Sequence, residues 1–285
     1  MQKFSFHNHT YRCRHAQADL TEERSVREYA ERGFTHMALT DHCPWKTFCL
    51  NEQYRGNMLY AEKQEYLEGI RRAKEKYQDV ITVYSGFETE HLPFLLDEIE
   101  EMRSEVDLMV LGQHYIYDSS SGAITHLYDP RRPFGDRAPA IYAACVEDAL
   151  QHGWPDILAH PDIIMLQQTS FGPKEEEAAH RIFSAAAQTG TPVEINLCQV
   201  ERITSGEKTS AAYPNREFWR VAAEYPVKVL YGIDCHWIRQ LDMYEQSLAE
   251  AERIIGKDIL SRLDFCTAED VLKKRGTDRK RGSAE

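Results

Sequence analysis

The chain lacks the apolar stretches that a membrane protein needs. None of its 285 residues belongs to a run of about 18 apolar residues, and its first residues contain no basic stretch followed by an apolar core. We therefore expect no membrane partner and no secretion signal, and we predict a cytoplasmic protein. Internal repeats, low-complexity tracts and linkers are also missing, which predicts one domain over residues 1–272 and a basic, frayed tail over residues 273–285.

An excess of positive charge is missing too. The sequence has 34 lysines and arginines against 46 aspartates and glutamates, which gives a formal net charge of -12 with neutral histidines. Such a surface repels the phosphate backbone of a long nucleic acid, so we expect a small substrate and no nucleic-acid partner. The sequence gives no indication of the oligomeric state.

The seven cysteines show no C-x-x-C pair of the kind found in a zinc ribbon, and their odd number does not suit a closed disulfide framework. We expect free thiols in a reducing compartment. Cys13, Cys43 and Cys235 lie close in sequence to the metal-ligand candidates described below. Their expected role is that of a small apolar filler beside the site, with a thiolate ligand as the alternative.

Seven short apolar runs alternate with helix-like segments, which predicts parallel β/α units. Thr21 precedes the acidic pair Glu22 and Glu23, which suits a helix start, and Gly33 ends that helix before the second strand. Two further helices are expected over about 138–152 and 174–189. The predicted strands cover residues 3–6, 34–39, 80–87, 108–112, 156–159, 192–195 and 227–231.

Residues of the types that bind metals gather where these strands end. His7 and His9 follow the first strand, and Asp234 and His236 follow the last. Side chains at i and i+2 of a strand share a face, so each pair presents two ligands to one place. In a parallel barrel all the strand ends lie on the C-terminal face, where such folds build their active sites. The other strand ends carry His42, Glu88, His114 and His160.

A single pair of this kind among 12 histidines is more often incidental than functional, but the whole set is hard to explain without cations. Imidazoles crowded against carboxylates would otherwise form an expensive cluster of polar groups. Imidazole nitrogens and carboxylate oxygens together bind zinc, manganese, iron or cobalt, and the set does not indicate which. The sequence therefore predicts a metal centre.

The ordered set closely resembles the polymerase and histidinol phosphatase (PHP) superfamily of metal-dependent phosphoesterases, from His7 to about Trp237. The segment His7-Asn8-His9-Thr10-Tyr11-Arg12-Cys13-Arg14-His15 is similar to the opening motif of the histidinol-phosphatase branch. The resemblance implies a distorted (β/α)7 TIM-like barrel with three divalent metal ions at the C-terminal ends of its strands. By motif, the first ion would be bound by His7, His9, Glu88 and Asp234, the second by Glu88, His114 and His160, and the third by His15, His42 and His236. Glu90 competes with Glu88, but the Gly-x-Glu register favours Glu88.

The resemblance also implies hydrolysis of a small phosphomonoester, with L-histidinol phosphate as the best candidate substrate. Closely spaced divalent ions lower the pKa of a shared water and present it as hydroxide to phosphorus, so no protein nucleophile is needed. Asp41 and Asp162 are candidates for supplying or relaying a proton to the leaving alcohol. Orienting a metal-bound imidazole is the more common task of such a carboxylate.

The chain departs from these relatives in its phosphate-binding residues. Histidinol-phosphate phosphatases of this family tend to carry an arginine after the strand-five His-x-Asp and another after the strand-six Glu-Ile-Asn. Residues 160–168 and 194–200 contain no arginine after these motifs. Arginine binds phosphate through paired hydrogen bonds, so other cationic side chains would have to replace it. The candidates are Arg12, Arg14, Arg202, Lys208 and Arg216, together with Arg131 and Arg132 in the long polar loop 115–139, which is a candidate lid.

Three alternatives stay open at this point. A PHP phosphoesterase for a sugar phosphate, a nucleotide or a cyclic phosphate would suit the missing arginines. An amidohydrolase-type metal hydrolase also begins with H-x-H, but that class would favour an eighth strand and a bridging modified lysine. A catalytically silent barrel module would be expected to lose ligands, whereas this chain keeps all nine.

Overall fold

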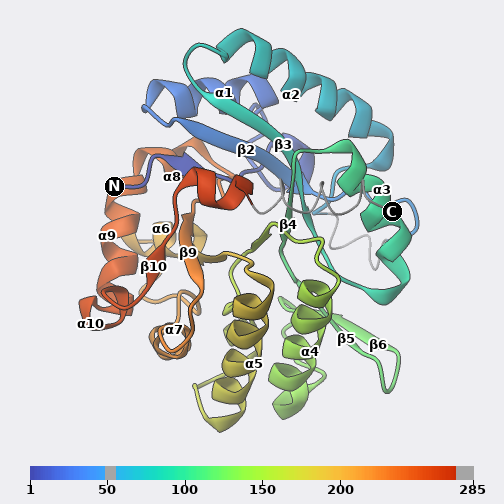
Figure 1. The fold of residues 1–285 in the computed structure, drawn as a ribbon, viewed down its shortest axis with the longest axis vertical. Coiled ribbons are helices and arrows are strands. Elements are labelled where there is room, and N and C mark those ends of the chain that lie inside the picture. The colour runs from blue at the N-terminus through green and yellow to red at the C-terminus, as the bar shows by residue number, and fades with distance from the viewer. Residues whose placement is uncertain (49–55, 274–285) are drawn as a thin grey trace.

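The computed structural model of the protein describes residues 1–48 and 56–273. Its centre is a curled parallel sheet whose eight strands follow the order β1-β2-β3-β4-β7-β8-β9-β10 (Figure 1). Each of the seven predicted strands overlaps one of them, so the predicted α/β architecture is confirmed. The strands are β1 (Phe4–Ser5), β2 (His36–His42), β3 (Thr82–Thr89), β4 (Leu108–Leu111), β7 (Ile157–Leu158), β8 (Val193–Asn196), β9 (Lys228–Gly232) and β10 (Asp264–Phe265).

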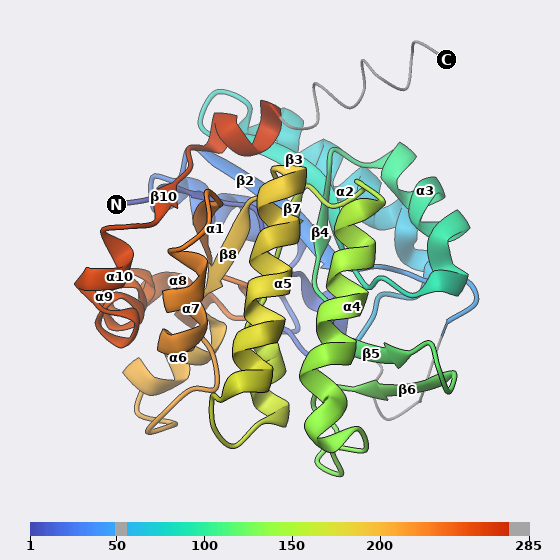
Figure 2. The same ribbon diagram turned by 60° about the horizontal axis from the view of Figure 1, so that its bottom comes forward.

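The helices lie around the outside of the sheet (Figures 1 and 2). The predicted start of the first one is confirmed, because the Thr21 side chain accepts a hydrogen bond from the N–H of Arg24. None of the described helices is long and apolar enough to cross a membrane. They are α1 (Glu22–Glu31), α2 (Lys63–Tyr77), α3 (Leu96–Glu105), α4 (Ala138–Gln151), α5 (Pro173–Thr189), α6 (Cys198–Thr204), α7 (Arg216–Ala222), α8 (Ile238–Asp242), α9 (Tyr244–Ile255) and α10 (Lys257–Leu260).

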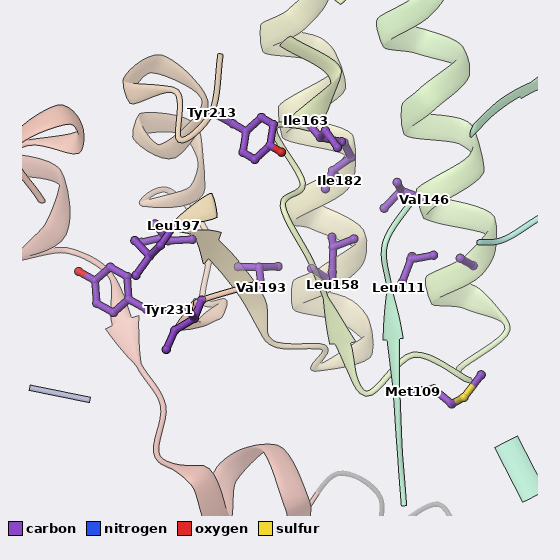
Figure 3. Close-up of a cluster of buried hydrophobic side chains, with 14 of the residues drawn as sticks. Met109, Leu111, Val146, Leu158, Ile163, Ile182, Val193, Leu197, Tyr213 and Tyr231 are labelled. Carbon is purple, nitrogen blue, oxygen red and sulfur yellow. The ribbon is translucent and has the colours of Figure 1, made fainter. Parts of the chain in front are cut away.

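Alternate residues of the strands face two different apolar clusters. On β4, Leu108 and Val110 belong to the cluster inside the curled sheet, whereas Met109 and Leu111 pack outward among helix residues. Figure 3 shows part of the outer cluster, in which Leu111 lies close to Val146 of α4. The strands are therefore covered on both sides, as the continuous apolar runs of the sequence predict.

The chain segments that follow β1 and β9 lie side by side. The N–H of Asp234 donates to the carbonyl of His7 over 3.0 Å, and the N–H of His9 donates to the carbonyl of Cys235 over 3.0 Å. An isolated parallel bridge joins Asn8 to Cys235 between these bonds. The two ligand pairs at opposite ends of the sequence are therefore neighbours in space.

One strand was not predicted. β10 extends the sheet beyond β9, with Asp264 opposite Lys228 and Phe265 opposite Val229. It is two residues long and both are exposed. Unlike the equally short β1 and β7, which are buried, β10 contains an exposed aspartate and lies in no apolar run, so the sequence does not indicate it.

The expectation of a plain polar loop over residues 115–139 is corrected by the structure. The segment contains a hairpin in which β5 (Tyr115–Asp118) pairs antiparallel with β6 (Ala123–His126). The Asp118 carboxylate accepts hydrogen bonds from the N–H and hydroxyl of Ser120, and Gly122 takes a φ of +70°. The polar residues that suggested a loop therefore form the turn of the hairpin.

The six cysteines among the described residues are free thiols, and five of them are buried, in agreement with the sequence prediction. Cys49 lies outside the described residues, as does the predicted tail from residue 274 onward. The boundaries of the predicted single domain therefore stay a prediction.

Candidate metal centre

The interior of the curled sheet changes from apolar to metal-binding side chains along its strands. Ala38 of β2 and Leu230 of β9 pack in the inner apolar cluster. Since every second residue of a strand shares a face, His42, four residues after Ala38, points to the same side at the end of the interior. Asp234 lies two residues beyond β9, and its carboxylate lies against His9 at the same end of the interior. The predicted convergence at the strand ends follows from this alternation.

Glu88, near the end of β3, lies at the centre of the cluster and is 3% exposed. The two oxygens of this one carboxylate face two different groups of imidazoles. Oε1 lies 3.1 Å from His160 Nε2, 3.3 Å from His7 Nε2 and 3.6 Å from His114 Nε2, and Oε2 lies 2.9 Å from His42 Nδ1 and 3.4 Å from His9 Nε2.

Asp234 and His15 complete the cluster. Asp234 Oδ1 lies 3.1 Å from His9 Nε2, 3.3 Å from His236 Nδ1 and 3.6 Å from His7 Nε2. The ring of His15 lies 4.5 Å from that of His236 and 5.3 Å from that of His42, measured between ring centres. The structure thus brings all nine ligand candidates of the sequence together.

Several polar atoms of this cluster are buried without a hydrogen-bond partner, namely His7 Nε2, His9 Nε2, His236 Nε2 and Glu88 Oε2. Each such atom costs about 1–3 kcal/mol, so packing alone does not explain a group of them facing one another. Imidazole nitrogens and carboxylate oxygens donate lone pairs to divalent cations. The candidate ligand atoms of His9, His42 and His236 all lie within 4.8 Å of one another. The residues present therefore fit divalent metal ions.

Carboxylates hold the far nitrogens of three histidine rings. Glu90 accepts a hydrogen bond from Nδ1 of His114 at 2.8 Å, and Glu194 accepts one from Nδ1 of His7 at 3.0 Å. Asp41 lies 3.4 Å from Nδ1 of His9. Contacts of this kind fix the ring orientation and the tautomer that a metal-binding imidazole needs. Backbone carbonyls do the same for two more rings, Cys13 for His15 at 2.7 Å and Asp234 for His236 at 2.9 Å.

These contacts distinguish the positions of the carboxylates whose roles the sequence left open. The geometry favours Glu88 over Glu90 as the central carboxylate, because Glu90 lies behind His114. Asp41 lies beside Nδ1 of His9, where a carboxylate can orient the ring, and its role stays a prediction. Glu194 was not predicted as a site residue, although the Glu-Ile-Asn alternation on a buried strand was its signal.

The surroundings of the histidines divide them by charge state. Burial alone would lower the pKa of His9 and of His114, but nearby carboxylates outweigh it and raise each pKa to about 9. Burial and neighbouring imidazoles instead lower the pKa of His15 to about 4, and the pKa values of His42 and His236 are also lowered, mainly by burial. The last three rings are therefore uncharged near neutral pH, which is the form that binds a cation.

The two carboxylates inside the cluster stay ionised. Burial would raise the pKa of Glu88 and of Asp234, but the surrounding histidines outweigh it and hold both pKa values well below their ordinary range. The cluster therefore offers charged oxygens together with the neutral nitrogens of His15, His42 and His236, and this donor set suits zinc, manganese, iron or cobalt.

Asp162 lies apart from this cluster. Its Oδ2 accepts hydrogen bonds from the N–H of Asn215 at 2.7 Å and from the indole N–H of Trp219 at 2.9 Å. Burial raises the pKa of Asp162 to about 7 against the effect of these hydrogen bonds. These hydrogen bonds hold the N-terminal end of α7, and the proton-transfer role considered from the sequence stays a prediction.

The cluster lines a cleft of about 940 Å³. Of the predicted substrate-binding residues, Arg14 and Arg202 line this cleft, and Lys208 donates to Gln199, which also lines it. Arg12 and Arg216, the other two candidates, do not line the cleft. Arg12 is buried against Glu22 and Glu65, and Arg216 pairs with Asp258, so an acidic partner holds each guanidinium elsewhere.

Other residues that line the cleft were not indicated by the sequence, because they do not lie at the end of a predicted strand. Arg239 pairs with Glu201 at 2.8 Å and with Glu207 at 2.6 Å. The hydroxyls of Tyr128 and Tyr213, which come from two different loops, lie 3.1 Å apart. His126 of the hairpin and Trp237 after β9 also line the cleft. Whether the hairpin acts as a lid stays a prediction.

The curled parallel sheet and the histidine-carboxylate cluster at its strand ends define a TIM-like α/β metalloprotein. The chain belongs to the PHP domain family, which matches residues 5–197. The family resemblance drawn from the sequence motifs is thereby confirmed.

The chain is similar to a curated protein of Schizosaccharomyces pombe named "Probable histidinol-phosphatase", with 24% identity over 264 residues that cover 84% of this chain and 82% of that protein. In fold it is similar to a Listeria monocytogenes protein assigned as a histidinol phosphatase, with a TM-score of 0.69, 19% identity, and coverage of 84% of this chain and 97% of that one. The histidinol phosphate phosphatase of Lactococcus lactis subsp. lactis, solved with zinc, L-histidinol and phosphate, gives a TM-score of 0.63, 17% identity, and coverage of 90% and 94%.

Proposed function

We propose that the protein is a metal-dependent phosphatase that hydrolyses L-histidinol phosphate to L-histidinol and phosphate. The observation that carries this proposal is the buried carboxylate of Glu88, whose oxygens face five imidazoles beside an open cleft. Centres of this composition hold the closely spaced divalent ions that hydrolyse phosphate esters. Membership of the PHP family and the names of the relatives support the choice of substrate.

We propose three divalent ions in this centre. Glu88 would bridge the first two, which is supported by the different histidines that its two oxygens face. The uncharged rings around His236 support a separate third position. The ligands would be His7, His9, Glu88 and Asp234 for the first ion, Glu88, His114 and His160 for the second, and His15, His42 and His236 for the third.

We also propose that the sheet is a distorted (β/α)7 barrel that closes between β1 and β9, with β10 as an added strand. The backbone hydrogen bonds between the segments after β1 and β9 support this closure. Further down, the side chain of Gln2 donates to the carbonyl of Tyr231 at 2.7 Å and accepts from its N–H at 3.0 Å. The side-chain amide of Gln2 thus makes the hydrogen bonds to β9 that the backbone of a neighbouring strand would make at this position.

Bound divalent ions would activate a water for attack on phosphorus and neutralise charge on the phosphate oxygens. Glu88 and Asp234 would hold these ions through ionised oxygens. Asp41, Glu90 and Glu194 would keep three histidine rings turned toward the ions, so that no ring has to reorient during the reaction.

The walls of the cleft would position the ester. Arg14 and Arg202 line it, and their charge would attract a phosphate dianion to a protein whose net charge is -12. The hydroxyls of Tyr128 and Tyr213 add neutral hydrogen-bond donors on the same surface. These groups are the available substitutes for the arginines missing from the two motif positions.

The alternatives are less well supported. No lysine lines the cleft among the described residues, so an amidohydrolase with a bridging modified lysine does not fit. A silent module would not keep buried, unpaired ligand atoms. Another small phosphate ester stays the second candidate, because the two motif positions lack arginine.

The test is phosphate release from a panel that contains L-histidinol phosphate, sugar phosphates and nucleotides, with the metal-loaded protein. We expect L-histidinol phosphate to give the highest kcat/KM, and Asp234→Asn to lower it by about 100-fold or more. Asp136→Asn, which changes an exposed carboxylate paired with Lys174, is the matched control. If the loaded protein cleaves no phosphate ester, the proposal fails; if it spares only L-histidinol phosphate, the substrate alone is wrong.

A further inference from the structure

Glu194 of β8 is a fully buried carboxylate outside the proposed ligand set. Its oxygens lie 3.0 and 3.1 Å from Nδ1 of His7, and no lysine or arginine pairs with it within the described chain. Removing a charged side chain from water is costly, so a buried carboxylate is expected to have a counter-charge or a functional role. Glu194 does not line the cleft, so its role is not direct contact with a substrate.

The structure makes room for this side chain at one specific place. Asn196 of β8 lies opposite Gly232 of β9, and a Cβ added to Gly232 would lie 2.6 Å from Cγ of Glu194 and closer still to its carboxylate. The backbone of Gly232 does not have positive φ, so its conformation does not require glycine. The glycine at position 232 instead leaves the space that the side chain of Glu194 occupies.

Asn196 connects Glu194 to a second ligand candidate. Its amide oxygen accepts the N–H of Cys198 at 2.9 Å, which turns the amide nitrogen toward the interior. That nitrogen donates to Glu194 at 2.8 Å and to Asp234 Oδ2 at 3.1 Å. One strand therefore holds His7 and Asp234, which come from opposite ends of the chain.

We propose that Glu194 is a positioning residue for the ion held by His7, His9, Glu88 and Asp234. A carboxylate only accepts hydrogen bonds, so when the His7 ring gives up a proton to bind a cation, the remaining proton lies on Nδ1 and the lone pair lies on Nε2. Nε2 is buried without a hydrogen bond and faces Glu88 at 3.3 Å and Asp234 at 3.6 Å. Glu194 thereby fixes the tautomer and the direction of one ligand, and Asn196 transmits the same constraint to Asp234. The proposal rests on the metal centre of the proposed function.

The test is titration of the metal-free protein with zinc alone against a fluorescent chelator, which needs no substrate. Glu194→Gln keeps a hydrogen-bond acceptor beside His7 but removes the negative charge that raises the basicity of the metal-binding imidazole. We therefore expect one zinc equivalent to bind about 10- to 100-fold more weakly while the other equivalents keep their affinity. Glu147→Gln is the matched control, because it makes the same change in a partly buried glutamate paired with Arg181 on the outer surface.

A second variant tests whether Gly232 acts through Glu194. Gly232→Ala should weaken the same zinc equivalent by displacing the carboxylate. In a Glu194→Ala background the obstruction is gone, so Gly232→Ala should then change zinc affinity by less than about twofold. Non-additivity of this kind distinguishes a specific contact from general damage to the sheet.

Two results would overturn the proposal. One is wild-type zinc binding by Glu194→Gln, whether or not hydrolysis is lost. The other is equal weakening of every zinc equivalent with a matching drop in the melting temperature of the metal-free protein, which would assign Glu194 a purely structural role. Failure of the proposed function would look different, since the wild-type protein would then bind zinc but cleave no phosphate ester.

Discussion

A single methyl group at Gly112 should disable the metal centre. Gly112 follows β4 on the inner side of the sheet, and a Cβ added there would lie 2.5 Å from Cδ and 2.6 Å from Cγ of Glu88. Its φ is not positive, so alanine causes no backbone strain. The effect of Gly112→Ala would therefore act through displacement of Glu88.

The size of the displacement sets the expected effect. Ordinary van der Waals contact begins at 3.4 Å, and the added Cβ would lie 1.9 Å from Oε1 of Glu88. This ligand oxygen must therefore move by about 1.5 Å, several times the ~0.2 Å within which metal-ligand distances are held. Glu88 has no free direction of movement, because imidazoles surround both of its oxygens. We expect kcat/KM to fall by about 100-fold or more, which corresponds to about 2.7 kcal/mol of transition-state stabilisation.

The measurement combines phosphate release with metal content determined by elemental analysis. Gly56→Ala is the control, because it adds a methyl group to the same cleft at an ordinary 3.4 Å from the ring of His15. If Gly112→Ala keeps the metal content and the activity of Gly56→Ala, Glu88 is not the bridging ligand and the reasoning from the cluster geometry is refuted.

Two further predictions concern pH and Asp162. The pKa values of His9 and His114 are about 9 in the folded metal-free protein against 6.5 in the unfolded chain, so their stabilising contribution is complete below pH 6.5 and is lost as the pH rises toward 9. Metal ions need these rings deprotonated, so the increase in melting temperature caused by zinc should grow over this range, and a shrinking increase would contradict the ligand assignment. Asp162→Asn should keep near-normal kcat/KM because an amide oxygen still accepts both N–H groups, whereas Asp162→Ala should lower the free energy of unfolding in urea by about 2–4 kcal/mol. Loss of hydrolysis in Asp162→Asn at unchanged stability would instead support a proton-transfer role.

The strand ends were predictable because two simple regularities coincide there. Apolar runs mark the strands, and parallel strands place their ends on one side of a sheet. The ligand candidates other than His15 lie at the end of such a run or just after it, as His160 follows Ile157 and Leu158, whereas His15 lies in the segment between β1 and α1 and was indicated only by the motif. The position of Glu88 at the centre could also be predicted from its register relative to Gly86.

Contacts between distant segments could not be predicted in the same way. Whether an arginine faces the cleft depends on which carboxylate it meets, and Arg12 is held by Glu22 and Glu65 through the packing of α1 and α2. Asp162 follows a ligand candidate by two residues, yet its partners lie more than 50 residues further along the chain. Such pairings are set by the tertiary fold, which local spacing does not encode.

The glycines of the interior carry information that the histidines alone do not. Gly86, Gly112 and Gly232 each stand two residues before a ligand candidate, namely Glu88, His114 and Asp234. A Cβ at Gly86 would meet the backbone carbonyl of Leu108 at 2.6 Å, and those at Gly112 and Gly232 would meet the side chains of Glu88 and Glu194. Since alternate residues of a strand share a face, Gly86 lies directly below Glu88 on β3, whereas His114 and Asp234 lie just beyond the ends of β4 and β9. The carboxylates of neighbouring strands lie across two of these positions. Gly112 and Gly232 therefore leave the space that the carboxylates of Glu88 and Glu194 occupy, so the absence of a side chain at these two positions is part of what places the carboxylates of the metal centre.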